Sequence, residues 1–161
     1  MPLQPGDAAP DVTLPSAENQ QVPLAGLWRD QPLVLMFFPL AFTSTCTEEL
    51  CAVRDDMGSY SGLNARVAAV SVDSPYVLDR FRKEIGADYL FLSDFNREAS
   101  RAFGVLREAP LGPGLRHASD RATFVIGTDG RVKYTWHSAN PGLLPPFEEI
   151  KGALAGDGVN G

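Results

Sequence analysis

The hydrophobic residues of this chain gather in short runs, separated by polar segments that contain glycine or proline. Segments of strand length are predicted at 11–14, 21–24, 32–38, 66–72, 89–92, 122–127 and 131–136. The runs at 32–38 and 66–72 are almost continuously apolar, which is typical of central strands covered on both faces. The runs at 11–14 and 21–24 are short and alternating, so we expect edge strands or a hairpin there. The Thr-Asp-Gly turn at 128–130 indicates a hairpin between the last two runs.

Helical segments are predicted between these strands, at 45–60, 75–85, 97–103 and 146–154. In the first of them, Thr45 and Glu48 match the capping box S/T-x-x-E, which makes Thr45 the N-cap and Glu48 the third helical residue. Pro75 takes the first position of the second helix, where proline is tolerated, and Gly86 ends that helix. The composition of 109–120 predicts a loop. Strands that alternate with helices and end in a hairpin predict an α/β fold: a central mixed sheet with helices on both faces, compatible with a thioredoxin-like layout.

The length and net charge of the chain limit the number of domains and the kinds of partner that it can have. With 161 residues, no internal repeat and no low-complexity linker, the chain is expected to form a single domain, 1–161, with an ordered core at about 5–154 and a fraying glycine-rich end. The net charge of -6 argues against nucleic acid or an anionic membrane as the principal partner. No apolar run approaches the ~20 residues of a membrane span. The N-terminal residues lack the layout of a signal peptide, so a cytoplasmic location is expected.

The most informative segment is 37–51, which contains both cysteines of the chain. Cys46 follows an apolar strand, Pro39 and a hydroxyl-rich turn, at the point where a helix is expected to begin. We expect this arrangement to present its thiol to solvent at the positive end of the helix dipole. In a reducing cytosol two cysteines favour a transient catalytic disulfide over a permanent one. The alternative interpretation makes Cys46 a small buried hydrophobic residue and Cys51 a core-facing helix residue.

A reactive thiol needs help from a positive charge. A free cysteine is mostly protonated at neutral pH, and the thiolate is the nucleophile. A helix N-terminus at an exposed site stabilises an anion by only about 0.3–1 kcal/mol. The carboxylates of Glu48 and Glu49 lie close by in sequence and oppose a second negative charge. We therefore expect an arginine from elsewhere in the chain to stand against Cys46.

The spacing of the two cysteines constrains a disulfide between them. In an intact α-helix, residues five apart have Cα atoms separated by roughly 8.6 Å. A disulfide needs a Cα separation of about 4.4–6.8 Å. Cys46 and Cys51 can therefore bond only if the first turns of the helix unwind, which is accessible at a helix end.

Metal binding is a weak alternative for the same residues. C-x4-C without a second pair of ligands is poor spacing for zinc, and His117 and His137 lie far from the cysteines in sequence. The C-x-x-C motif of dithiol oxidoreductases is absent.

Pro39, Thr43 and Cys46 match P-x-x-x-T-x-x-C, and on this motif the chain resembles the peroxiredoxin family. Segments 6–14, 91–94, 102–105 and 121–126 are similar to other segments of that family, so the resemblance spans roughly residues 5 to 150. The segment Phe38–Thr43 is most like the one-cysteine alkyl hydroperoxide reductase E type. Cys51 instead matches the bacterioferritin-comigratory or Q type, whose second cysteine sits five residues after the first.

The resemblance implies a peroxiredoxin version of the thioredoxin-like fold, with an N-terminal β extension, and a set of site roles. Cys46 would be the peroxidatic nucleophile, and Arg121 the cation that favours its thiolate. Thr43 would hydrogen-bond the thiolate and the peroxide, and Pro39 would shield the site from water. Glu49 would pair with Arg121 and so position it.

The implied reaction is the reduction of hydrogen peroxide or an organic hydroperoxide, for which no metal or organic cofactor is expected. Cys46 would become a sulfenic acid, condense with Cys51, and be restored by thioredoxin or a similar dithiol. If Cys51 is inert, the chain would be a one-cysteine peroxidase recycled by a small thiol. A thiol–disulfide oxidoreductase or redox sensor, and a non-enzymatic binding module with incidental cysteines, remain as alternatives. The resemblance allows a monomer or a homodimer.

Overall fold

The computed structural model describes residues 1–156. The strands are β1 (Thr13–Pro15), β2 (Gln21–Pro23), β3 (Leu33–Phe37), β4 (Arg66–Ser71), β5 (Leu90–Ser93), β6 (Arg121–Ile126) and β7 (Val132–Ser138). The helices are α1 (Leu24–Trp28), α2 (Ser44–Asp55), α3 (Met57–Gly62), α4 (Pro75–Ile85), α5 (Glu98–Ala102) and α6 (Phe147–Ala155). The predicted fraying of the C-terminus concerns mostly residues outside the described ones.

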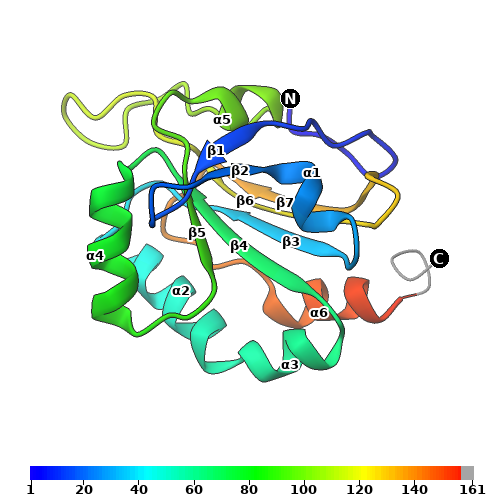
Figure 1. Ribbon diagram of the computed structural model, residues 1–161. Helices are drawn as coiled ribbons and strands as arrows, with labels where there is room; N and C mark the ends of the chain where they lie inside the picture. The colour runs from blue at the N-terminus through cyan, green and yellow to red at the C-terminus, as the bar shows by residue number, and fades with distance from the viewer. Residues whose placement is uncertain (157–161) are drawn as a thin grey trace.

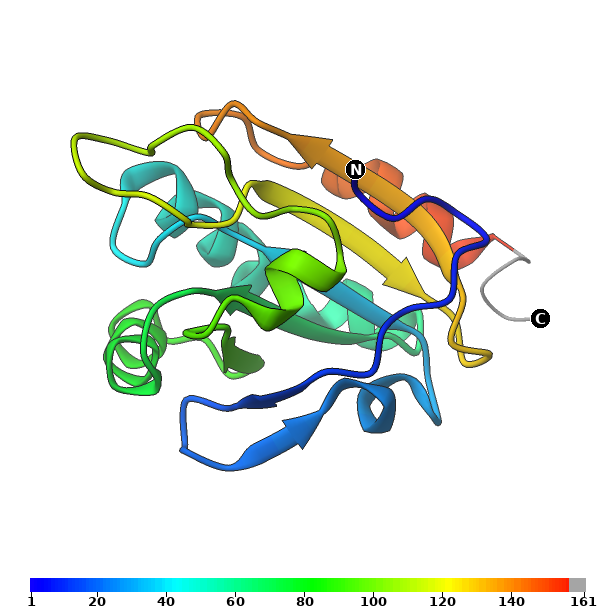
Figure 2. The same ribbon diagram turned by 90° about the horizontal axis from the view of Figure 1, so that it is seen from above.

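The central sheet has five strands in the order β5-β4-β3-β6-β7 (Figures 1 and 2). β3 pairs in parallel with β4, and β4 with β5, whereas β6 is antiparallel to both β3 and β7. β1 and β2 form a separate antiparallel pair near the N-terminus. The mixed sheet, the N-terminal hairpin and the predicted strand runs are confirmed.

Helices cover both faces of the sheet, as the alternating pattern predicts. One core cluster packs β3 and β4 against α2, α3, α4 and α6, through residues such as Val34, Leu50, Phe81 and Ile150. The other packs the opposite face against α1 and α5, through residues such as Leu24 and Phe103. In Figure 1 the two groups of helices lie on opposite sides of the strands. β3 is buried at every position, which explains its uninterrupted apolar sequence.

The predicted start of the helix that carries the cysteines is wrong by two residues. Thr43, not Thr45, is the N-cap: its backbone is extended (φ -82°, ψ 152°), and its carbonyl accepts the N–H of Thr47 at 2.9 Å. Neither hydroxyl caps the helix, because the Thr43 side chain instead donates to the carbonyl of Leu40 at 2.8 Å. The run Thr43–Thr47 offers several cap-forming side chains, so sequence alone did not select the right one.

The same helix is also shorter than predicted. α2 ends at Asp55, and α3 begins at Met57 after a break at Asp56. The Asp56 carboxylate accepts from Ser59 Oγ at 2.6 Å and pairs with Lys151 of α6 at 2.5 Å. A side chain that bonds its own turn and a distant lysine favours an interruption where helical periodicity predicts continuation.

Candidate active site

Cys46 lies in the first turn of α2, directly after the turn that leaves the C-terminal end of β3. This turn is fixed from the neighbouring strand: the N–H of Ala41 donates to Asp73 Oδ2 at 2.8 Å, and the same oxygen accepts from Ser71 Oγ at 2.6 Å. Phe42 adopts φ +69°, a conformation that bulky residues rarely take, and its ring lies 5.0 Å from that of Phe81. Strain in such a turn is common at functional sites.

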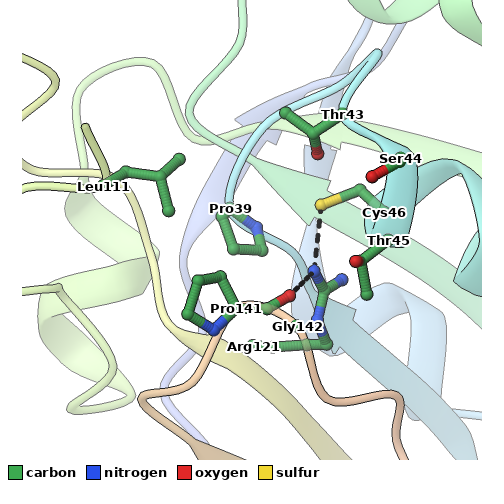
Figure 3. A pocket seen from close by; sticks show the side chains of 9 residues that line it. All are labelled: Pro39, Thr43, Ser44, Thr45, Cys46, Leu111, Arg121, Pro141 and Gly142. Carbon is green, nitrogen blue, oxygen red and sulfur yellow. Dashed lines mark hydrogen bonds between the residues drawn. The ribbon is translucent and has the colours of Figure 1, made fainter.

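Arg121 reaches Cys46 because of the sheet topology. It is the first residue of β6, which runs antiparallel to β3, so the start of β6 lies beside the end of β3 where α2 begins. Its Nη2 donates to Cys46 Sγ at 3.2 Å, although the two residues are 75 positions apart. The expected arginine against Cys46 is therefore present (Figure 3).

Arg121 has two further acceptors. Nη1 donates to Glu49 Oε1 at 2.5 Å, and Nη2 also donates to the carbonyl oxygen of Pro141 at 2.7 Å. Within residues 1–156 its Nε has no hydrogen-bond partner. The guanidinium is only 1% exposed, so its orientation is set by these three acceptors.

Glu49 occupies the next turn of α2 after Cys46 and is fully buried. Burial raises the pKa of Glu49 to about 7, because a carboxylate away from water is costly, although the nearby Arg121 guanidinium opposes this shift. Burial lowers the pKa of Arg121, but Glu49 and Cys46 more than offset this, and the net direction is upward. The predicted pairing of Glu49 with Arg121 is present in the structure.

A pocket of about 270 Å³ opens beside the sulfur. Its walls come from the β3–α2 turn, the first turn of α2, the loop at 109–120, the start of β6 and the β7–α6 loop. The lining residues are Pro39, Thr43, Ser44, Thr45, Cys46, Leu111, Arg121, Pro141 and Gly142 (Figure 3). Glu49 and Cys51 do not line it. The pocket brings three of the predicted site residues, Pro39, Thr43 and Arg121, around Cys46.

Two expectations about this pocket need correction. Cys46 is not presented to solvent: it is fully buried and packs within the larger core cluster, although it forms part of the pocket wall. Thr43 does not donate to the sulfur, because its single hydroxyl proton goes to the carbonyl of Leu40. The burial of Cys46 was not expected because a turn at the start of a helix usually lies at the surface.

Cys51 lies outside the pocket, one and a half turns along α2, and is half-buried against the core. Both cysteines are free thiols, and the helix between them is continuous. Next to Cys51, the carbonyl of Leu50 accepts from the Tyr89 hydroxyl at 2.6 Å, and Arg54 donates to the carbonyl of Ile85. The geometric expectation that the two thiols are apart in this state is confirmed.

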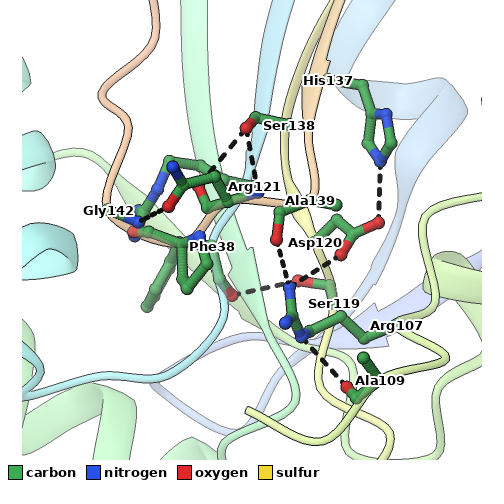
Figure 4. Close-up of polar contacts among 12 residues, drawn as sticks. Phe38, Arg107, Ala109, Ser119, Asp120, Arg121, His137, Ser138, Ala139 and Gly142 are labelled. Atoms are coloured by element: carbon green, nitrogen blue, oxygen red, sulfur yellow. Dashed lines mark hydrogen bonds and ion pairs between the residues drawn. The ribbon is translucent and has the colours of Figure 1, made fainter.

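A polar cluster lies behind the active site and joins the loop at 106–109 to the end of β7 (Figure 4). Arg107 donates to Asp120 Oδ1 at 3.1 Å and to the carbonyl of Ala139 at 2.7 Å. Asp120 also contacts His137 Nε2 at 2.7 Å. Ser119 donates to the carbonyl of Phe38 at 3.1 Å. These bonds fix Ser119 and Asp120, the two residues that directly precede Arg121.

The contribution of Pro141 was missed from the sequence, since a backbone carbonyl leaves no residue-type signal. The only indication is the run Asn140-Pro141-Gly142, whose composition predicts a tight turn. Within residues 1–156, no group of three or more His, Cys, Asp or Glu side chains could hold a metal ion. No helix in the described part of the chain has the length and apolar character needed to cross a membrane.

Comparisons with known proteins agree with this geometry. The profile of the AhpC/TSA family matches residues 5–135. Peroxiredoxin Bcp of Escherichia coli strain K12 is 30% identical over 135 residues, which cover 84% of this chain and 86% of that protein. Alkyl hydroperoxide reductase E of Mycobacterium bovis is 33% identical over 134 residues, which cover 82% of this chain and 84% of that protein.

Among solved structures, that of peroxidoxin BcpB from Mycobacterium tuberculosis matches with a TM-score of 0.83 and 29% sequence identity, over 95% of this chain and 97% of that chain. The fold is thus the thioredoxin-like fold of peroxiredoxins. The family match covers most of the chain and includes Pro39, Thr43, Cys46 and Arg121. The chain therefore belongs to the AhpC/TSA family and is a peroxiredoxin, an oxidoreductase of the peroxidase class.

Proposed function

We propose that this chain is a cytoplasmic thiol peroxidase that reduces hydrogen peroxide and organic hydroperoxides through Cys46, with Cys51 as the resolving cysteine and thioredoxin or a similar dithiol as the reductant. The observation that carries the proposal is the hydrogen bond from Arg121 Nη2 to Cys46 Sγ at 3.2 Å, beside an open pocket. This contact places a buried positive charge against the sulfur, and a thiolate is the nucleophilic form of cysteine that such a charge attracts.

In the first step the Cys46 thiolate attacks one peroxide oxygen. An S–O bond forms as the O–O bond breaks, giving Cys46 sulfenic acid, and the leaving oxygen departs as water or alcohol after taking a proton. Arg121 lines the same pocket, so its positive charge lies close to the place where negative charge develops on the leaving oxygen. Pro39 lines the pocket beside Cys46, and we assign it the role of limiting the access of water to the sulfur.

We assign Thr43 a role that requires a change of partner. Its hydroxyl borders the pocket and donates to the carbonyl of Leu40 in the peroxide-free state. A hydroxyl rotates at low cost, so Thr43 can turn its proton toward a bound peroxide oxygen while it accepts a hydrogen bond from the peroxide. This role predicts that Thr43→Val slows the peroxide reaction and that Thr43→Ser retains most of the rate.

In the second step the Cys51 thiol attacks the sulfenic sulfur, which forms the disulfide and releases water. In the third, a dithiol reduces this disulfide by exchange and is itself oxidised. The second step requires α2 to unwind between Ser44 and about Leu50, because the helix holds the two sulfurs apart. The alternatives are a one-cysteine peroxidase recycled by a small thiol, and a redox sensor without rapid turnover.

Steady-state peroxide consumption with thioredoxin and thioredoxin reductase tests the proposal. We expect turnover in the wild type, none in Cys46→Ser, and a loss of at least about tenfold in Cys51→Ser. After one equivalent of peroxide, non-reducing mass spectrometry is expected to find one intramolecular Cys46–Cys51 disulfide. A persistent sulfenic acid in the wild type, with turnover unaffected by Cys51→Ser, would instead support the one-cysteine mechanism.

A further inference from the structure

The orientation of Arg121 depends on a backbone group that belongs to neither α2 nor the central sheet. One Nη2 proton goes to Cys46 Sγ at 3.2 Å and the other to the Pro141 carbonyl at 2.7 Å, so this nitrogen has no third proton to offer. Glu49 holds only Nη1, and Nε has no partner among the described residues. The Pro141 carbonyl is thus the contact that stops the guanidinium from turning about its bond to Glu49.

The direction of that carbonyl is set by the asparagine before it. Asn140 Oδ1 accepts the N–H of Gly142 at 2.9 Å, which closes an Asx-type turn around Pro141. The N–H of Asn140 donates to Ser138 Oγ at 3.0 Å, which ties this turn to the end of β7. Pro141 itself has a restricted φ and no N–H. Figure 4 labels Ser138 and Gly142, the two residues that these contacts join to Asn140, in the same view as Arg121.

We propose that Asn140 is a positioning residue of the peroxide site: its side-chain oxygen holds the turn that aims the Pro141 carbonyl at Arg121 and so keeps Nη2 directed at the Cys46 sulfur. Asn140 is exposed, does not line the pocket and touches neither the sulfur nor the guanidinium. It acts only through the backbone. The inference rests on the proposed function for the role of Arg121 in catalysis, but not for its contact with the sulfur.

The consequence of losing the turn follows from burial. Without the side-chain acceptor, residues 140–142 gain freedom and the carbonyl leaves its position for part of the time. An Nη2 proton in a buried site then lacks its acceptor, and the guanidinium rotates toward another one. The sulfur loses a directed donor while the rest of the fold keeps its contacts, since within residues 1–156 the side chain of Asn140 makes no other hydrogen bond.

The test uses chains that carry Cys51→Ser, so that Cys46 is the only thiol. Three variants are compared with this parent. Asn140→Ala removes the acceptor, and Asn140→Ser restores one, because a serine oxygen can also bond the N–H two residues on. Asn96→Ala is the matched control, since Asn96 is an exposed turn asparagine whose side chain makes no hydrogen bond in the described structure.

Two rates are measured: alkylation of Cys46 by iodoacetamide at neutral pH, and its oxidation by hydrogen peroxide in stopped flow. Asn140→Ala is expected to slow both, by about tenfold for alkylation and by between about 10-fold and 100-fold for oxidation, where the position of Arg121 also matters for the transition state. Asn140→Ser recovers most of each rate, and Asn96→Ala changes neither. The urea midpoint is expected to be the same for all four chains.

Unchanged alkylation in Asn140→Ala, or equal rates in the alanine and serine variants, would overturn the positioning role. A parent that reacts with peroxide no faster than free cysteine would overturn the proposed function instead. In that case the alkylation rates still decide the question of Asn140, because they report the state of the thiol without requiring peroxidase activity.

Discussion

The two halves of α2 are held in place in different ways. In the first half, Cys46 and Glu49 are fully buried, yet both depend on the same side chain, Arg121, for their polar contacts. In the second half, Leu50 and Val53 pack into the core. There the helix backbone accepts the Tyr89 hydroxyl, and Arg54 bonds the end of α4.

This difference indicates which half can open. The first half has no side-chain cap and is tied to the sheet by one charged group whose interactions change as soon as the sulfur is oxidised. The second half is tied to Tyr89, just before β5, and to the end of α4, by contacts that do not involve Cys46. If the proposed Cys46–Cys51 disulfide forms, we expect Cys46 to move toward a stationary Cys51. The first half of α2 thus carries the reactive Cys46 and is the half expected to move, while the second half, with Cys51, is expected to stay in place.

The largest expected effect follows from removing the group that the first half depends on. Arg121→Ala should slow oxidation of Cys46 by between about 100-fold and 1000-fold, since a buried donor at a site of developing charge is lost. Arg121→Lys keeps the positive charge but loses the bidentate geometry of the guanidinium. Its oxidation rate is expected to lie between those of the wild type and Arg121→Ala. Stopped-flow oxidation by hydrogen peroxide measures the rates.

Arg80→Ala serves as the control for this comparison. Arg80 lies on the exposed side of α4 and pairs with Glu84 at 2.8 Å, so its removal changes the net charge by the same amount at a distance from the site. Its rate is expected to equal that of the wild type. Equal slowing in both variants would indicate a general effect of net charge and would contradict a specific role of Arg121 at the sulfur.

The second effect concerns pH and the buried carboxyl of the first half. The pKa of Glu49 is raised from 4.5 to about 7, so the folded chain retains a proton that the unfolded chain releases. Since the folded state then binds more protons, this group lowers stability as pH rises from 4.5 to 7, by about 3 kcal/mol, with no further change above that range.

Urea unfolding at several pH values across this range measures the contribution as a difference from the wild type. The glutamine in Glu49→Gln cannot ionise, so the variant does not lose stability as the wild type does. The difference in free energy of unfolding, variant minus wild type, should therefore increase as pH rises. Glu48→Gln makes the same chemical change at the exposed neighbouring position and should run parallel to wild type. Parallel curves for Glu49→Gln would show that the fold does not raise the pKa of this carboxyl.

The smallest effect belongs to the anchored half. Tyr89→Phe removes the hydrogen bond to the Leu50 carbonyl, worth about 1 kcal/mol, and is expected to speed amide exchange over residues 50–55 by about fivefold. Amides in the first turn should be unaffected, since that turn opens by itself. Tyr76→Phe is the control, because Tyr76 is 75% exposed. Faster exchange of both halves together would mean that α2 opens as one unit.

The sequence predicted the central strands and helices better than the contacts that form the active site. β3 and β4 were evident because both faces of each strand are buried, which leaves a continuous apolar run. α4 was evident from Pro75 and Gly86, and the left-handed conformation of Gly86 (φ +69°) explains the choice of glycine. Local rules suffice where local geometry and burial agree.

The site depends on contacts that no local rule contains. Glu49 and Arg121 are separated by 72 positions, and their pairing was expected only from the resemblance to peroxiredoxins. The start of α2 was misplaced because several hydroxyl residues compete for the cap, and the preceding turn is held by a tertiary contact, from Ala41 to Asp73, that the sequence does not reveal. The contact of Arg121 with the Pro141 carbonyl could not be predicted from the sequence, since every residue type has a backbone carbonyl.

The central claim is that the buried contact between Arg121 and Cys46 makes this thiol a fast nucleophile toward peroxides. The most direct test is the second-order rate constant for hydrogen peroxide with the Cys51→Ser chain, where Cys46 is the only thiol, beside that of free cysteine under the same conditions. The account predicts a rate at least ~1000-fold above free cysteine, in line with stabilisation of developing charge by a preorganised buried donor. A rate equal to that of free cysteine would contradict it.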